Sequence, residues 1–133
     1  MNKVFLIEDE LDILYLYKTA LKAADIAVET ASSGKEAMEK VKNMQKKKEE
    51  KPSLILLDLV LPDINGLEIL SSIRENSVTK DIVVFILSNY TSDALLNIKD
   101  IKPNKFIVKS SVTPTQLVDI VKQQISPVKN VKV

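Results

Sequence analysis

The sequence contains neither cysteine nor histidine, and only two of its 133 residues are glycine. Without cysteine, the chain has no disulfide bonds and no catalytic thiol. Without histidine, it has no imidazole for acid–base chemistry or metal binding, and no histidine that carries a phosphoryl group. Any chemistry in this chain must therefore rest on other side chains.

The charges are balanced, and the chain is rich in apolar residues. With 19 basic and 18 acidic residues, the net charge of +1 gives no reason to expect binding to nucleic acid or an anionic membrane. Hydrophobic residues make up 45% of the chain, enough for one domain, expected over 1–126 with a tail at 127–133. We find no signal peptide and no apolar run long enough to span a membrane, so a cytoplasmic protein is expected.

Short apolar runs alternate with amphipathic stretches along the chain. Five strands are predicted, at residues 4–7, 26–30, 54–57, 82–87 and 106–108. Five helices are predicted to follow them: one over 11–24, one capped by Ser33, one from Leu67, a short one capped by Thr91 or Ser92, and one capped by Thr113. The charged run from Gln45 to Lys51 is interpreted as a solvated helix extension and linker. This alternation predicts an α/β fold, with a single doubly wound, five-stranded parallel sheet and helices on both faces.

One stretch, Leu54 to Gly66, carries the strongest signal. Four apolar residues run directly into Asp58, which is typical of a strand buried on both faces. A lone charge is costly to bury, so Asp58 is expected where the strand ends. Pro62 and Gly66 then indicate a turn before the next helix. In open α/β sheets, ligands bind at this edge.

Polar side chains stand at the ends of four of the five predicted strands. They are Glu8 and Asp9, then Asp58, then Ser88, then Lys109. Because the carboxyl ends of parallel strands meet at one edge, these groups are expected to converge. Clustered carboxylates repel one another, and a hard divalent cation such as Mg²⁺ relieves that repulsion. A carboxylate held in this way is suited to attack phosphorus and form an aspartyl phosphate.

Taken singly, most of these residues have a plainer interpretation. Glu8 and Asp9 would cap the first helix, Ser88 would be an ordinary loop hydroxyl, and Lys109 would be a surface lysine. Asp58 is harder to explain in this way, because it ends the most apolar strand. Since the whole set falls at strand ends, a shared site is the better interpretation.

The ordered set resembles the receiver domain of two-component response regulators. The segment from Asp58 to Gly66 is similar to the family's loop after its phosphorylated aspartate. Glu8–Asp9, Ser88 and Lys109 match the remaining signature positions in order and spacing, and the resemblance covers about residues 3–125. It implies a flavodoxin-like fold with strand order 2-1-3-4-5.

The resemblance also implies how the site would work. Asp58 would accept a phosphoryl group from a phosphohistidine on a histidine kinase or a histidine phosphotransfer protein. The ligands of Mg²⁺ would be Glu8, Asp9, Asp58 and the backbone carbonyl of Val60. Lys109 would pair with the phosphoryl group.

A switch is implied at Ser88 and Phe106. Ser88 would bind the new phosphoryl oxygen and draw its loop inward, and Phe106 would turn into the space that Ser88 vacates. The fourth helix, fifth strand and fifth helix would form the output surface. In the commonest family pattern an aspartate stands at Glu8, a threonine at Ser88 and a tyrosine at Phe106, so this switch aromatic lacks a hydroxyl.

Two further departures lead to predictions of their own. Ser110 stands where the family usually has proline, often after a cis bond. Because a cis bond before a non-proline residue costs about 2.5–4 kcal/mol, a trans Lys109–Ser110 peptide and a rearranged loop are predicted. Val60 and Tyr90 hold the positions through which the family tunes attack by water. Neither carries an acid or an amide, so slow self-dephosphorylation is expected.

The main interpretation is a signalling switch rather than an enzyme, and a stand-alone receiver, because no output domain is expected after residue 126. One alternative is a receiver-like protein-binding module that works without phosphorylation, which a Mg²⁺ titration would distinguish. A second is an aspartate-nucleophile phosphohydrolase of the haloacid dehalogenase type. That chemistry requires a second aspartate two residues after the first, and Val60 occupies this position. A flavodoxin is disfavoured, because no hydroxyl- and glycine-rich loop follows the first strand.

Overall fold

The computed structural model describes residues 2–89 and 103–125. In these residues the strands are β1 (Lys3–Ile7), β2 (Ala27–Ala31), β3 (Leu54–Asp58), β4 (Val84–Ser88) and β5 (Lys105–Val108). The helices are α1 (Leu11–Ala23), α2 (Gly34–Gln45), α3 (Gly66–Glu75) and α4 (Pro114–Ile125), and a short 3₁₀ turn, η2 (Lys109–Ser111), follows β5. The predicted short helix after Thr91 or Ser92 and the predicted tail lie outside the described residues.

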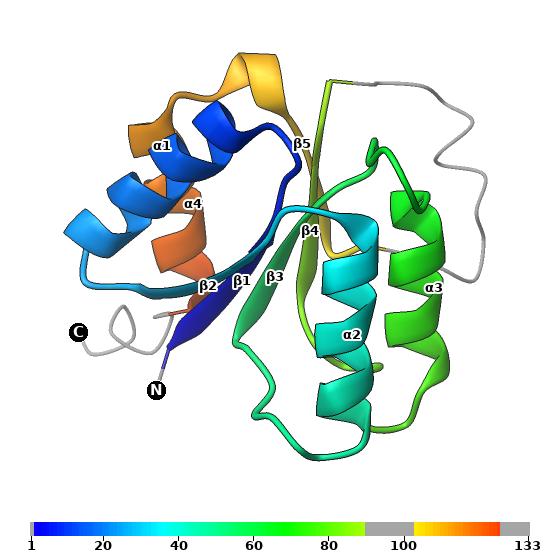
Figure 1. Ribbon diagram of the computed structural model, residues 1–133. Coiled ribbons are helices and arrows are strands. Elements are labelled where there is room, and N and C mark those ends of the chain that lie inside the picture. Colours follow the sequence, from blue (N-terminus) through cyan, green and yellow to red (C-terminus); the bar gives the residue numbers. More distant parts are fainter. Residues whose placement is uncertain (1, 90–102, 126–133) are drawn as a thin grey trace.

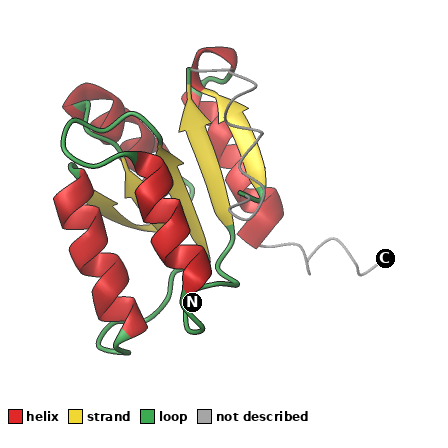
Figure 2. Ribbon diagram, turned by 90° about the vertical axis from the view of Figure 1, so that its right-hand side faces the viewer, coloured by secondary structure: helices red, strands yellow, loops and turns green. Residues whose placement is uncertain are grey.

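All strand pairs are parallel, and the strand order is β2-β1-β3-β4-β5, which confirms the predicted doubly wound sheet. Helices α1 and α4 cover one face, and α2 and α3 cover the other (Figure 1). Figure 2 is seen from the α2 and α3 side and shows these helices in front of the strands. Among the described residues, no helix combines the length and apolar character that a membrane span requires.

Alternate residues of the central strands bury against opposite helix layers. In β3, Leu54 and Leu56 pack toward α1 and α4, whereas Ile55 and Leu57 pack toward α2 and α3. Every residue of β3 and β4 is buried, which is why both strands are continuous apolar runs in the sequence. The run in β3 ends at Asp58, so the packing brings a carboxylate to the edge of the core.

Two helix N-termini follow the capping patterns in the sequence. Thr113 Oγ1 accepts a hydrogen bond of 3.1 Å from Gln116 N, and Gln116 Oε1 accepts one of 2.9 Å from Thr113 N, a complete capping box. At α2, Ser33 Oγ accepts a hydrogen bond of 3.1 Å from Glu36 N, as predicted. The Glu36 carboxylate instead reaches Ser32 N, at 2.8 Å, so this box closes one residue earlier.

The predicted helical extension of α2 is wrong, because the helix ends at Gln45. Lys47 has a φ of 61°, and this left-handed conformation turns the chain away from the helix axis. The nitrogens of Lys47 and Lys48 then donate to the carbonyls of Met44 and Asn43, at 3.0 and 2.8 Å. These bonds satisfy the last carbonyls of the helix, so the charged run forms a turn.

Candidate functional site

The strand register brings the predicted polar residues to one edge of the sheet. Ile7 pairs with Leu57, Asp58 pairs with Leu87, and Ser88 pairs with Val108. Glu8 follows β1 directly, and Lys109 follows β5 directly. Residues from four strand ends therefore lie side by side, as predicted from their positions in the sequence.

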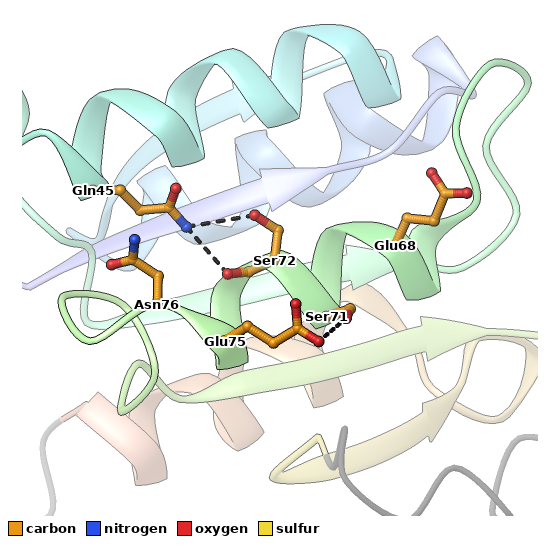
Figure 3. Close-up of a pocket in the computed structure, with 6 residues that line it drawn as sticks. All are labelled: Gln45, Glu68, Ser71, Ser72, Glu75 and Asn76. Carbon is orange, nitrogen blue, oxygen red and sulfur yellow. Dashed lines mark hydrogen bonds between the residues drawn. The ribbon is translucent and has the colours of Figure 1, made fainter.

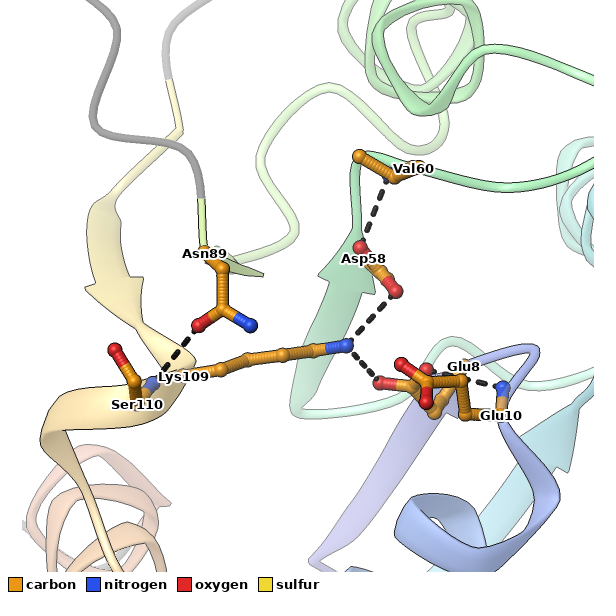
Figure 4. A network of polar contacts seen from close by, with 7 residues as sticks. All are labelled: Glu8, Glu10, Asp58, Val60, Asn89, Lys109 and Ser110. Atoms are coloured by element: carbon orange, nitrogen blue, oxygen red, sulfur yellow. Dashed lines mark hydrogen bonds and ion pairs between the residues drawn. The ribbon is translucent and has the colours of Figure 1, made fainter.

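Lys109 is the cation at the centre of this edge. Its Nζ lies 2.7 Å from Glu8 Oε1 and 3.0 Å from Asp58 Oδ2 (Figure 4). The side chains of Lys109, Glu8 and Asp58 are 8%, 1% and 5% exposed, so both ion pairs are shielded from solvent. Burial alone would lower the pKa of Lys109, but contacts with Glu8 and Asp58 outweigh it and raise that pKa. Lys109 is therefore firmly protonated.

Asp58 is oriented by two contacts that come from different parts of the chain. Its Oδ2 pairs with Lys109, 51 residues away in sequence, and its Oδ1 accepts a hydrogen bond of 3.0 Å from Val60 N. Buried carboxylates persist only when they are paired in this way. The side chain is held in one orientation at the end of β3.

Glu8 is a buried carboxylate whose charge its contacts only partly stabilise. Its Oε2 accepts a hydrogen bond of 3.1 Å from Glu10 N. Its buried Oε1 accepts no hydrogen bond from the residues that the structure describes and forms an ion pair with Lys109. Burial raises the pKa of Glu8 to about 7, with Asp58 adding to the effect and Lys109 opposing it. The single positive charge of Lys109 thus compensates only part of the negative charge of these carboxylates.

The carboxylate group fits a divalent cation. Glu8, Asp9 and Asp58 each offer an oxygen, and these oxygens lie within 4.8 Å of one another. Three carboxylate oxygens are hard ligands of the kind that Mg²⁺ prefers. The buried Glu8 Oε1, which accepts no hydrogen bond among the described residues, is consistent with a carboxylate that lacks a full set of partners. A cation here would balance the charge that Lys109 alone leaves uncompensated.

Asp9, Asp58 and Lys109 border an open hollow of about 380 Å³. Its lining residues are Asp9, Glu10, Asp58, Val60, Ser88, Asn89 and Lys109. The charged and polar lining suits a small polar group approaching Asp58. Val60 is half exposed at its edge, so its isopropyl group borders the approach to the carboxylate.

A second hollow of similar size, about 390 Å³, lies between the end of α2 and α3 (Figure 3). Gln45 Nε2 donates to Ser72 O at 3.1 Å, and Ser71 Oγ donates to Glu75 Oε2 at 3.0 Å. The remaining lining residues are Glu68 and Asn76, so the lining contains acids and neutral polar groups without a cation. It therefore lacks the charge pairing found around Asp58.

The other predicted residues are placed as follows. Ser88 is buried at the end of β4 and lines the same hollow as Asp58. Phe106 is partly buried on the α2 and α3 face of the sheet, beside Ile86 in the register. Tyr90 lies outside the described residues. Among residues 2–89 and 103–125 there is no cis peptide bond, so the Lys109–Ser110 peptide is trans as predicted. The turn η2 follows β5 directly, and the rearrangement of this loop stays a prediction.

Sequence reasoning gave no role to Asn89 or Asp63. Asn89 directly follows Ser88 at a strand end, so the rule that found Ser88 also applies to it. Asp63 accepts hydrogen bonds from Gly34 N and Lys35 N, at the start of α2. No local pattern indicates a contact between segments so far apart in sequence.

Comparison with known proteins agrees with this geometry. The family model described as the response regulator receiver domain matches residues 4–122. The chain belongs to this family of two-component signalling domains. Response regulator ArlR of Staphylococcus saprophyticus is 34% identical over 109 residues, which is 82% of this chain and 46% of ArlR. The chain spans less than half the length of the first curated relatives that it matches.

Two solved receiver structures are similar over nearly the whole chain. The phosphorylated cyanobacterial phytochrome response regulator RcpA is 32% identical, with a TM-score of 0.78 and 95% of each chain covered. Response regulator TrrA of Thermotoga maritima, in complex with Mg²⁺–BeF, is 27% identical, with a TM-score of 0.76. That match covers 93% of this chain and 99% of TrrA.

Proposed function

We propose that this receiver domain is a phosphorylation-dependent signalling switch in which Asp58 accepts a phosphoryl group from a phosphohistidine. The observation that carries the proposal is the shielded Asp58–Lys109 ion pair, which lies beside two further carboxylates at an open hollow. Because these 133 residues contain no histidine, the phosphohistidine must lie outside them, and its proposed carrier is a histidine kinase or a histidine phosphotransfer protein. Such a partner would act in the cytoplasm.

Mg²⁺ is the cofactor of this proposal. Glu8, Asp9 and Asp58 would hold it together with the backbone carbonyl of Val60. When bound, Mg²⁺ neutralises the negative charge that builds up as the phosphoryl group approaches the carboxylates. The Mg²⁺–BeF complex of TrrA supports this choice of ion.

The chain's own residues would supply the nucleophile and the donors. An Asp58 carboxylate oxygen forms a bond to phosphorus as the bond from phosphorus to the imidazole nitrogen breaks. The imidazole keeps the electron pair and takes up a proton. Lys109 Nζ and the Ser88 hydroxyl would donate to the phosphoryl oxygens, which stabilises the charge during transfer.

The change at Asp58 would be transmitted through neighbouring strand ends. Ser88 would move toward the phosphoryl group, and Phe106 would turn into the space it leaves. The output surface would comprise β5, α4 and the helix predicted after Thr91 or Ser92, and it would bind a downstream protein. The process is a local change of charge that biases a two-state element.

Intact mass after incubation with acetyl phosphate and Mg²⁺ tests the proposal. The parent is expected to gain one phosphoryl group, and Asp58→Asn is expected to gain none. Asp12→Asn, which removes an exposed aspartate in the first turn of α1, is the matched control and is expected to gain phosphate like the parent. A parent that binds Mg²⁺ but gains no phosphate would favour a module that works without phosphorylation.

A further inference from the structure

Asn89 is a polar residue of the Asp58 hollow that has no role in the proposed mechanism. It directly follows the last residue of β4, and it lines the hollow together with Asp58, Ser88 and Lys109. An asparagine amide carries one acceptor oxygen and a nitrogen with two donor hydrogens. Which end faces the hollow therefore decides what it can bind.

The orientation of this amide is fixed by the backbone of Ser110. Ser110 N donates a hydrogen bond of 2.9 Å to Asn89 Oδ1. A backbone N–H is only a donor, so the amide atom that faces Ser110 must be the oxygen. Figure 4 shows the amide nitrogen on the other branch, turned toward the side where Lys109 and Asp58 lie. Within residues 2–89 and 103–125, Nδ2 donates no hydrogen bond that would hold it elsewhere.

The hydrogen bond from Ser110 N to Asn89 Oδ1, here called the tether, depends on which residue stands at position 110. Ser110 has a backbone N–H and lies in the turn η2, directly after Lys109. A proline at this position would have no N–H and would leave Asn89 Oδ1 without this partner. The peptide group between Lys109 and Ser110 therefore also orients the Asn89 amide.

A phosphoryl group at Asp58 could accept hydrogen bonds from the two amide hydrogens of Asn89. Its terminal oxygens need several donors, and Lys109 is already shared between Glu8 and Asp58. A neutral amide can donate to a phosphoryl oxygen, and it adds no charge that would weaken the ion pairs. Hydrogen bonds to charged groups are among the stronger ones in proteins.

We propose that Asn89 is a further phosphoryl-binding residue of this site, held by Ser110 N so that its amide hydrogens donate to a phosphoryl oxygen at Asp58. The proposal rests on the proposed function and adds a contact to it. It predicts a role in binding the phosphodonor that is separate from folding and from binding of the metal ion.

Two substitutions at Asn89 test the donor directly. Asn89→Asp keeps an oxygen that accepts from Ser110 N but removes both donor hydrogens, whereas Asn89→Ala removes the whole amide. Initial rates of phosphorylation are measured by mass over a series of acetyl phosphate concentrations at saturating Mg²⁺. Asn89→Ala is expected to lose about tenfold in rate at low acetyl phosphate, as the loss of one charged hydrogen bond implies. Asn89→Asp is expected to lose at least as much, because its carboxylate also repels the anionic donor.

The tether is tested at Ser110. Ser110→Pro and Ser110→Ala both lose the hydroxyl, but only the proline variant loses the N–H. Ser110→Pro is expected to need a higher acetyl phosphate concentration for half-maximal rate than Ser110→Ala. Mg²⁺ affinity by calorimetry and the melting temperature are expected to stay close to the parent values in Asn89→Ala, which a purely structural role would not allow.

The outcomes separate this inference from the function on which it rests. If the parent gains no phosphate from acetyl phosphate, the proposed function fails. If the parent is phosphorylated and both Asn89 variants match its rate at every donor concentration, only the role of Asn89 is overturned. Equal losses of rate and of Mg²⁺ affinity in Asn89→Ala would also overturn it, because Asn89 would then act on the metal site.

Discussion

The Asp63 carboxylate accepts a hydrogen bond of 2.8 Å from Gly34 N, 29 positions earlier in the chain. Its second oxygen accepts one of 2.9 Å from Lys35 N, so Asp63 caps the N-terminus of α2 from another segment. These backbone hydrogen bonds, that from Lys35 first, lower the pKa of Asp63. The loop that carries Val60 is thereby fastened to a helix.

We expect Asp63→Ala to lower both stability and Mg²⁺ affinity, because it releases the loop that carries the Val60 carbonyl. Ser33→Ala is the matched control, since it removes another cap of the same helix without touching this loop. It is expected to cost about 1 kcal/mol of stability and to leave Mg²⁺ affinity unchanged. Urea unfolding and calorimetric Mg²⁺ titration measure the two effects. Equal Mg²⁺ affinities in both variants would show that Asp63 only caps the helix.

The contribution of Asp63 should depend on pH with a definite sign. Because its pKa in the folded protein lies below the ordinary value of 3.8, the stabilisation is complete above that value. It is lost as the pH falls through the lowered pKa. The difference in urea midpoint between the parent and Asp63→Ala should be constant above about pH 5 and shrink in stronger acid. A difference that grows in acid would contradict this account.

Gly66 holds a position with no space for a side chain. An added Cβ would lie 2.6 Å from Leu59 Cα and 2.7 Å from Asp58 O, both backbone atoms that have little freedom to move. Gly66→Ala is expected to cost about 1–3 kcal/mol in urea unfolding and to slow phosphorylation, because it displaces the end of β3.

Asn65→Ala provides a control for Gly66→Ala at the start of the same helix. It removes the 2.8 Å cap from Leu67 N to Asn65 Oδ1 without pressing on Asp58. This variant should lose about 1 kcal/mol while its phosphorylation rate stays near that of the parent. A Gly66→Ala protein as stable as the parent would contradict this expectation. It would show that the backbone of Asp58 and Leu59 can move to accommodate the added Cβ.

Lys109 also has a structural role before any phosphoryl group binds. Lys109→Met leaves Glu8 and Asp58 buried without their counter-ion and is expected to cost about 3 kcal/mol. Mg²⁺ should then restore more stability to the variant than it adds to the parent, because the cation replaces the missing positive charge.

Urea unfolding with Mg²⁺ and with a chelator tests this expectation. Lys105→Met, which removes an exposed lysine of β5, the strand that Lys109 follows, is the control and should respond to Mg²⁺ like the parent. The same gain from Mg²⁺ in Lys109→Met and in the parent would argue against a cation bound among these carboxylates.

The alternating strands and helices and the buried strands of the fold could be predicted from the sequence. β3 and β4 are continuous apolar runs because both of their faces are covered, and Glu8, Asp58 and Lys109 converge because parallel strands end at one edge. The end of α2 was not predicted, since a mixed run of lysine and glutamate suits a helix or a turn. The left-handed Lys47 decides between them, and it is not a glycine that would signal that conformation.

The contacts that the sequence could not predict join distant segments through single side chains. The Asp63–Gly34 and Asn89–Ser110 hydrogen bonds have no periodic pattern, because each depends on two loops meeting in space. The pairing of Lys109 with both Glu8 and Asp58 likewise required the register of the sheet. The strand ends determine roughly where these side chains lie. Single contacts between distant segments then determine how the side chains are oriented.

Val60 is expected to prolong the phosphorylated state. Val60 is 50% exposed and lines the hollow together with Asp58, and its isopropyl group offers no atom that orients water. Val60→Asn introduces an amide that can hold water and should speed loss of phosphate several-fold. Val60→Ala, which shortens the side chain and adds no amide, should have a smaller effect. Mass measured over time after removal of acetyl phosphate follows the loss, and a Val60→Asn protein no faster than the parent would contradict the expectation.

The position of the covalent phosphate is the most direct test of the whole account. An aspartyl phosphate is reduced by borohydride, whereas a free carboxylate and a serine phosphate are not, so the reduced residue can be located by peptide mass. After incubation with acetyl phosphate and Mg²⁺, the account predicts reduction at Asp58 alone, and none when Mg²⁺ is chelated. Reduction at Asp9 or Glu8 with Asp58 untouched would contradict it.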